Sequence, residues 1–178
     1  MSTPSSGSGL KTFTAVIAVI FGLVLLIGGI YLAVLGGSWY YIIAGLLFIA
    51  TAVLLQKLKS TALIVYALLV LGTVVWGLWE VGSDFFALAP RLDILGLFGL
   101  WLLIPAVTRG FDNAKSAKLV LTGSLAITIA VMIYAVFNDP QEIRGELSSK
   151  QPATAQSIPG VADGDWPAYG RTQSGLRY

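Results

Sequence analysis

Long uninterrupted runs of apolar residues dominate this sequence, and they predict helices that cross a membrane. Five runs can be marked, at residues 12–35, 39–56, 61–79, 92–107 and 119–137. Each approaches or exceeds the roughly 17–25 residues that a helix needs to cross about 30 Å of hydrocarbon. Such ungapped runs suit helices better than the alternating strands of a membrane barrel. We therefore predict an all-α membrane protein with five transmembrane helices. The fourth is the shortest, and it either recruits part of the preceding FFALAP sequence or thins the bilayer locally.

The charges between these runs predict an orientation. Basic residues lie before the first run and in the second and fourth connections, namely Lys11, Lys57, Lys59, Arg109, Lys115 and Lys118. These three positions fall on one side if all five helices cross. On the other side, Arg91 is the only basic residue in the two interhelical connections. The positive-inside rule then predicts a cytoplasmic N-terminus and an external C-terminus.

Composition agrees with a membrane location and removes several classes of chemistry. The chain is 56% hydrophobic and 11% charged, which is too little polar surface for a soluble domain of 178 residues. The first run is too long for the core of a signal peptide, which has roughly 7–15 apolar residues. The absence of cysteine and histidine excludes disulfides, thiol and imidazole catalysis, and the usual zinc and haem ligands. A net charge of +2 gives no basic field for nucleic acid, and we predict no catalytic or metal-ligating residue.

The composition changes after Phe137. Residues 138–164 are rich in Pro, Ser, Ala and Gln and predict an extended linker outside the membrane. Residues 165–178, DWPAYGRTQSGLRY, bring back aromatic and turn-forming residues and look like the first strand of a further domain. The expected organisation is a cytoplasmic segment at 1–11, a five-helix domain at 12–137, the linker, and the start of a domain that the sequence does not complete.

Four separated motifs carry a family resemblance. They are GGSWYY at residues 36–41, WGLWEVGSDFFALAPRLDIL at 76–95, FNDPQEI at 137–143 and DWPAYGRTQSGLRY at 165–178. With these motifs in this order, the chain resembles the N-terminal membrane domain of the PQQ-dependent (quinoprotein) glucose dehydrogenases, in the branch that also contains quinate and shikimate dehydrogenases.

The resemblance implies a five-helix anchor in the bacterial inner membrane. In that family the anchor carries a large periplasmic β-propeller, which binds PQQ and calcium and passes electrons to ubiquinone. The implied partners are therefore the lipid bilayer, ubiquinone and the propeller. The residues that bind PQQ, calcium and sugar lie in the propeller, so the resemblance assigns none of them, and no enzymatic activity, to this chain. A related polyol dehydrogenase has a similar five-helix module as a separate subunit, so a stand-alone subunit is the alternative.

Residues 76–93 are the candidate quinone-proximal loop. A quinone site needs aromatic faces, hydrogen-bond donors and a proton relay, and this stretch offers Trp76, Trp79, Phe85, Phe86 and Arg91 for the first two and Glu80, Asp84 and Asp93 for the third. In the alternative interpretation the tryptophans belong to the aromatic belt, Asp93 caps the fourth helix, and Arg91 pairs with a nearby acid. Both interpretations stay open. Loss of ubiquinone reduction without loss of dye reduction, after replacement of Glu80, Asp84 and Arg91, distinguishes them.

Three further expectations follow from the apolar runs. Trp39, Tyr40 and Tyr41 are interpreted as interface anchors in preference to quinone contacts. No ionisable residue lies in the middle of a predicted span, which disfavours a transporter or channel. Glycines within the runs are expected to let helix backbones approach closely, and they are Gly22, Gly28, Gly29, Gly45, Gly72, Gly77, Gly96, Gly99 and Gly123.

Overall fold

The computed structural model describes residues 6–138, and these residues form helices and no strands. The helices are α1 (Ser6–Val34), α2 (Tyr40–Gln56), α3 (Thr61–Val81), α4 (Phe85–Leu102), α5 (Pro105–Thr108) and α6 (Ala114–Phe137). All of them belong to one compact unit, Met1–Glu142. The all-α class is thus confirmed for this part of the chain. The predicted linker after Asn138 and the predicted start of a further domain at 165–178 lie outside the described residues.

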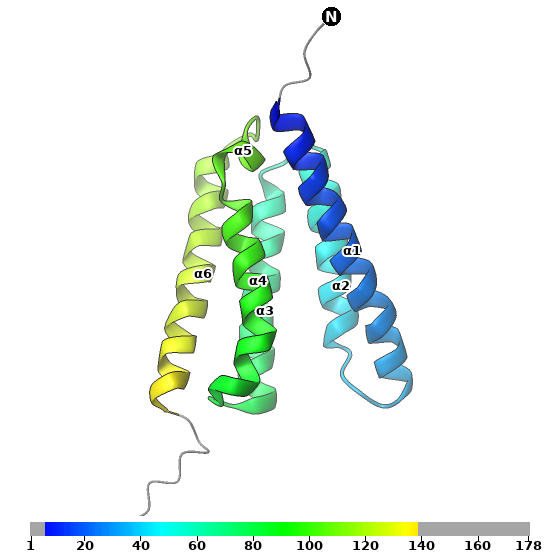
Figure 1. The fold of residues 1–178 in the computed structure, drawn as a ribbon, viewed down its shortest axis with the longest axis vertical. Coiled ribbons are helices and arrows are strands. Elements are labelled where there is room, and N and C mark those ends of the chain that lie inside the picture. The colour runs from blue at the N-terminus through cyan, green and yellow to red at the C-terminus, as the bar shows by residue number, and fades with distance from the viewer. Residues whose placement is uncertain (1–5, 139–178) are drawn as a thin grey trace, which may run out of the picture. The chain divides into compact units, whose positions relative to one another are not determined.

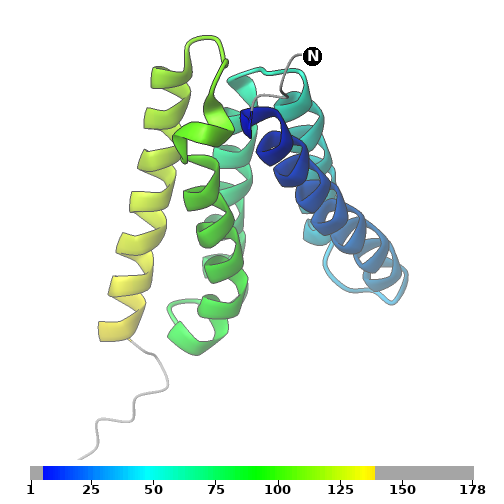
Figure 2. The same cartoon turned by 45° about the horizontal axis from the view of Figure 1, so that its top comes forward.

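Five of these helices run alternately in opposite directions (Figure 1). Four are long and apolar enough to cross a membrane, namely Gly9–Val34, Thr61–Val81, Phe85–Leu102 and Ala114–Phe137, whereas Tyr40–Gln56 has 17 residues. We call the end at which α1, α3 and α6 finish and α2 and α4 begin the exit end. The opposite end, where α1 begins, is the entry end. Towards the exit end, the α1–α2 pair leans away from α3, α4 and α6 (Figures 1 and 2).

The fourth helix takes in the whole of FFALAP, of which only a part was expected, and this changes the candidate loop. Gly82 ends α3 with φ +66°, a backbone conformation that glycine adopts without strain. Asp84 then caps α4, because its Oδ1 accepts a hydrogen bond of 3.1 Å from the backbone N–H of Ala87. The expectation that Asp93 caps this helix is therefore wrong. What was expected to be a long loop is a turn of three residues, 82–84, and Arg91 and Asp93 lie inside α4.

Two other expectations, which concern the positions of charged residues, are also corrected. No ionisable residue was expected within a span, yet Arg91 and Asp93 lie in a helix long and apolar enough to cross the membrane. The basic residues assigned to connections partly belong to helices, since Lys11 lies in α1 and Lys115 and Lys118 lie in the first turns of α6. At its other end α4 stops at Leu102 because Pro105, which lacks a backbone N–H, opens the short helix α5.

Glycines set the spacing of α1 and α2. A Cβ placed on Gly45 would lie 2.7 Å from the carbonyl oxygen of Gly22, and one placed on Gly29 would lie 2.7 Å from the backbone nitrogen of Ile42. Only residues without a side chain allow these backbones to come so close. Close packing is also found at Gly77 and Gly99, where a Cβ would lie 3.0 and 2.9 Å from leucine methyl carbons. The expectation of close approach is wrong at Gly28, Gly72, Gly96 and Gly123, where a Cβ would have no neighbour within 4 Å.

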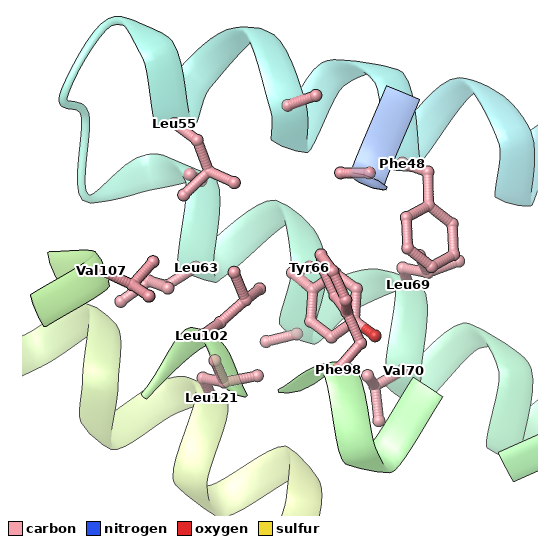
Figure 3. Close-up of a cluster of buried hydrophobic side chains, with 14 of the residues drawn as sticks. Phe48, Leu55, Leu63, Tyr66, Leu69, Val70, Phe98, Leu102, Val107 and Leu121 are labelled. Atoms are coloured by element: carbon pink, nitrogen blue, oxygen red, sulfur yellow. The ribbon is translucent and has the colours of Figure 1, made fainter. Parts of the chain in front are cut away.

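The core of the bundle is an aromatic cluster where α1, α2, α3 and α4 meet. Phe48, Tyr66 and Phe98 lie with ring centroids 5.4–5.8 Å apart, and Phe21 contacts Phe98 at 6.3 Å (Figure 3). Two hydrogen bonds tie α4 to its neighbours. The buried Tyr66 hydroxyl donates to the Leu95 carbonyl at 2.7 Å, and the Trp101 indole donates to Thr14 Oγ1 at 3.0 Å. Helix α4 is therefore held by both α1 and α3.

Candidate functional site

A cavity of about 250 Å³ lies among α1, α2, α3 and α4 on the exit-end side of the aromatic core. Aromatic and aliphatic side chains make most of its surface. The lining residues are Phe21, Val24 and Leu25 from α1, Tyr40, Tyr41, Ala44 and Phe48 from α2, Thr73 and Trp76 from α3, and Pro90, Arg91, Ile94 and Leu95 from α4. The cavity thus contains one cationic side chain in an otherwise largely apolar enclosure.

One wall of the cavity is a preformed aromatic stack. Tyr40 stacks on Trp76 with ring centroids 4.0 Å apart and an interplanar angle of 7°, and Tyr41 meets Trp76 edge-on at 5.4 Å. These rings meet because α2 and α3 run in opposite directions, so that the beginning of α2 lies beside the end of α3. Offset and edge-on aromatic contacts are favourable in themselves. The wall therefore holds its shape without a ligand.

A chain of hydroxyl groups occupies the same wall. The Tyr40 hydroxyl is hydrogen-bonded to Thr73 Oγ1. Thr73 Oγ1 also lies 2.8 Å from the carbonyl oxygen of Leu69, one turn earlier in α3. Since threonine has one hydroxyl proton, and it is donated to this carbonyl, Tyr40 donates to Thr73. Both hydroxyl protons are then engaged within the protein.

Arg91 provides the polar side of the cavity. Side chains on a helix point back towards its beginning, and the Arg91 guanidinium accordingly reaches the Ala87 carbonyl through Nη1 and Glu80 Oε2 through Nη2, the latter at 3.1 Å. Its Cζ lies 5.5 Å from the centre of the Trp76 ring, within the range of a cation–π contact. The Nε atom of Arg91 is buried and has no hydrogen-bond partner within the described part of the chain. Arg91 thus lines the cavity and carries one N–H donor that the protein covers and that has no acceptor among the described residues.

The structure brings together some of the sequence-predicted site residues and separates others. Trp76 and Arg91 line the cavity, and Glu80 is the ion-pair partner of Arg91. Asp84 serves as the helix cap, and Trp79, which is 83% exposed, lies in a shallow surface depression on α3. Asp93 is exposed and does not line the cavity.

The two phenylalanines of the candidate loop are also outside the cavity. Phe85 packs against a second buried cluster formed by Val74, Leu88, Leu92 and Ala135 near the exit end. Phe86 is 79% exposed. The predicted contribution of aromatic faces therefore comes from α2 and α3, and not from the beginning of α4.

Sequence reasoning missed Tyr40, Tyr41 and Thr73. The two tyrosines were interpreted as interface anchors, and their contacts with Trp76 and their place in the cavity wall were not anticipated. Trp39 is 70% exposed, as an interface anchor would be. The available signal was the position of Tyr40 and Tyr41 directly after a glycine reversal. At this position they form the first turn of α2, and their side chains already face the interior of the bundle.

The arrangement suits a planar, apolar ring that carries hydrogen-bond acceptors. The walls are aromatic and aliphatic, and the cationic Arg91 among the lining residues can donate to an acceptor such as a carbonyl oxygen. The described residues contain no group of three or more Asp or Glu side chains that could hold a metal ion.

Comparison with known proteins identifies relatives of two kinds. The quinoprotein glucose dehydrogenase A of Acinetobacter calcoaceticus is 62% identical over all 178 residues, and the quinoprotein glucose dehydrogenase of Escherichia coli is 51% identical over 170 residues, or 95% of the chain. The chain spans only about a fifth of the length of these two relatives, 22% and 21%. The glycerol dehydrogenase small subunit of Gluconobacter thailandicus is 37% identical over 103 residues, which are 56% of this chain and 81% of that subunit.

No family model and no solved structure matches the chain. The relatives nevertheless agree with the resemblance seen in the four motifs, because the matched region is the N-terminal part of the dehydrogenases and nearly the whole of a small subunit. The chain therefore belongs to the family of membrane domains shared by the quinoprotein glucose dehydrogenases and the small subunits of glycerol dehydrogenase.

Proposed function

We propose that this chain anchors a PQQ-dependent dehydrogenase of the glucose and quinate branch in the bacterial inner membrane and binds the quinone that accepts its electrons. The apolar helices and the relatives support the anchoring role. The buried, unpartnered Nε–H of Arg91 in an aromatic cavity is the observation that supports the quinone role. The dehydrogenase oxidises its substrate in its own catalytic domain, which lies on the periplasmic side.

In this proposal all five long helices cross the membrane, with the entry end in the cytoplasm. Helix α2 is about 25 Å long at 1.5 Å per residue, a little shorter than the roughly 30 Å of a typical hydrocarbon core, and modest bilayer thinning accommodates the difference. The beginning of α1, the α2–α3 turn and the α5–α6 connection lie at the entry end (Figure 1). These segments and the first turns of α6 carry Lys11, Lys57, Lys59, Arg109, Lys115 and Lys118. The positive-inside rule then puts the entry end inside and the end of α6 outside in this proposal.

Quinone reduction sets the chemical demands on the cavity. A quinone takes up two electrons and two protons to become a quinol, so its carbonyl oxygens gain electron density before they are protonated. A cationic donor beside one carbonyl stabilises that density, and this stabilisation is strongest where water is excluded. Arg91 Nε–H meets this requirement in our proposal, with Tyr40 and Trp76 forming the ring wall. Glu80, which pairs with Arg91 and is partly exposed, provides a route for protons from the exit end.

PQQ and calcium belong to the catalytic domain in this proposal. The described residues offer no carboxylate cluster for calcium. The cavity among α1, α2, α3 and α4 has a single arginine, which fits the carbonyl of a quinone better than the several acidic groups of PQQ. The part of the chain at 6–138 therefore acts as membrane support and as the acceptor site.

Replacement of Arg91 tests the quinone role. In a dehydrogenase that carries this domain, Arg91→Gln is expected to lower the efficiency of ubiquinone reduction roughly ten- to a hundredfold, because a hydrogen bond to a charged group is worth about 1.5–3 kcal/mol. Reduction of a soluble artificial dye at the catalytic domain should not change. Arg109→Gln, at an exposed position at the entry end, is the control and should leave both activities unchanged.

Two outcomes of this experiment would contradict the proposal. Equal losses with ubiquinone and dye would mean that Arg91 supports folding of the enzyme and not the acceptor site. Unchanged ubiquinone reduction would mean that the quinone does not bind in this cavity.

A second candidate function is that of a separate membrane subunit that binds its dehydrogenase non-covalently. The match to 81% of the glycerol dehydrogenase small subunit favours it, since that relative consists of little beyond the matched region. Purification of the tagged chain from its native membranes in mild detergent distinguishes the two. A separate PQQ dehydrogenase recovered in equimolar amount supports the subunit, whereas covalent continuity with a catalytic domain supports the anchor.

A further inference from the structure

The cavity has room for a ring but not for a complete membrane quinone. Its volume is about 250 Å³, whereas sites that enclose a whole drug-sized ligand measure roughly 300–1,000 Å³. A long isoprenoid tail must therefore leave the cavity and enter the hydrocarbon of the bilayer. The surrounding helices indicate the direction in which the tail leaves.

A second hollow of about 270 Å³ adjoins the cavity on the α1 side. Val24, Leu25 and Tyr41 line both spaces and form their common boundary. Beyond this boundary, the hollow passes over Gly28 and reaches Leu32. A Cβ on Gly28 would have no heavy atom within 4 Å, so the hollow is open at this residue.

Two other sides of the cavity are closed by packing. The Tyr40–Trp76 stack, at 4.0 Å, closes the side between α2 and α3. Between α3 and α4, Gly77 packs against a leucine methyl group of α4, where an added Cβ would be 3.0 Å away. By contrast, the hollow on the α1 side is open at Gly28, where a Cβ would meet no heavy atom within 4 Å. The α1 side is therefore the open direction.

We propose that the isoprenoid tail of the bound quinone leaves through this hollow, along residues 24–32 of α1, with Gly28 as the residue that keeps the passage open. This inference rests on the proposed function, because it requires a quinone ring in the cavity. Val24 is 64% exposed on the outer surface of α1, so a chain that passes this residue enters the lipid directly. The occupant is apolar, flexible and attached to the ring, as an isoprenoid is.

The test compares short and long tails on the chain embedded in lipid nanodiscs. A photoreactive quinone with a single isoprene unit labels the cavity, and unlabelled ubiquinones with a single unit or a long tail compete with it. Gly28→Leu fills the hollow and should raise the amount of long-tailed ubiquinone needed for half displacement several-fold, with no change for the short-tailed competitor. Gly123→Leu is the matched control, because Gly123 in α6 also has no neighbour within 4 Å of a Cβ, and it should change neither.

The outcomes separate this inference from the function on which it rests. If the short-tailed probe labels the cavity but Gly28→Leu affects neither competitor, or both equally, the tail route is refuted and the ring site stands. If the probe labels no cavity residue in the unsubstituted chain, the ring site and the tail route both fail. If Gly28→Leu instead removes a co-purifying phospholipid and leaves quinone competition unchanged, an acyl chain occupies the hollow and the inference is overturned.

Discussion

The contact between α1 and α2 depends on Gly45, and replacing it with alanine tests that dependence. The added Cβ would lie 2.7 Å from the Gly22 carbonyl oxygen and 2.7 Å from the Leu26 backbone nitrogen. Both neighbours are backbone atoms, which cannot rotate out of the way as the end of a side chain can. Ordinary contact of a Cβ begins at 3.4 Å, so the two helices must separate by about 0.7 Å, the difference between 3.4 and 2.7 Å.

The expected loss of stability comes from two opposing terms. Overpacking of a close helix contact costs about 1–3 kcal/mol. Alanine favours a helix over glycine by about 1 kcal/mol, which offsets part of this loss. Gly28→Ala in α1 receives the same helical gain without the clash, because nothing lies within 4 Å of its Cβ. The two variants should therefore differ by about 1–3 kcal/mol, with Gly45→Ala the less stable.

Unfolding of the purified chain in mixed micelles with increasing SDS measures this difference. Gly45→Ala should unfold at a lower SDS fraction than Gly28→Ala. It should also bind the short-tailed quinone more weakly, because the α1–α2 spacing positions Val24 and Ala44 in the cavity wall. Equal stability of the two variants would refute the close contact, and with it the glycine-set spacing of α1 and α2.

Three further substitutions test individual contacts in the same SDS assay. Tyr66→Phe removes the hydroxyl that donates to α4 and should lower stability by about 0.5–1.5 kcal/mol. Tyr134→Phe, at an exposed position of α6, should be neutral, and equal effects of the two would contradict a specific hydrogen bond. Asp84→Ala removes the cap of α4 and should lower stability by about 1 kcal/mol, whereas Asp84→Asn should keep most of that stability. No loss of stability with alanine would exclude a capping role. Glu80→Gln removes a partly exposed ion pair with Arg91 and should change stability by about 1 kcal/mol or less. It should also slow quinone reduction. A large loss of stability would instead indicate a structural ion pair.

The helices and their order were predictable because apolar length is a local property of the sequence. The runs at 61–79 and 119–137 correspond closely to α3 (Thr61–Val81) and α6 (Ala114–Phe137). The prediction failed at α4 because charged residues and a proline were taken as marks of a loop. In the structure Asp84 caps the helix, and Pro90 lies in its second turn. Pro90 removes only one N–H from the helix ladder, and the helix continues through it.

The cavity could not be predicted in the same way, because it depends on pairs of residues far apart in the sequence. Tyr40 and Trp76 are stacked although they are 36 positions apart, and no local pattern specifies that α2 presents its first turn to the last turns of α3. Arg91 was identified from its residue type and position, but its ion pair with Glu80 requires the tight turn at 82–84 that brings the ends of α3 and α4 together. The residue types of the candidate site could thus be identified from the sequence, whereas the cavity that the helices form around them could not.

Arg91 links the architecture of α4 to the proposed function. A charged side chain within a spanning helix is unfavourable unless its donors are satisfied. The structure satisfies Nη1 with the Ala87 carbonyl and Nη2 with Glu80, both towards the exit end, and leaves Nε–H buried beside the Trp76 ring. An arginine retained only to stabilise the bundle gains nothing from a buried donor without a partner, since an apolar residue of similar size would avoid that penalty. In the proposed function, a carbonyl oxygen of the quinone completes the hydrogen bonding of Arg91, and the least favourable side chain of α4 then belongs to the proposed binding site.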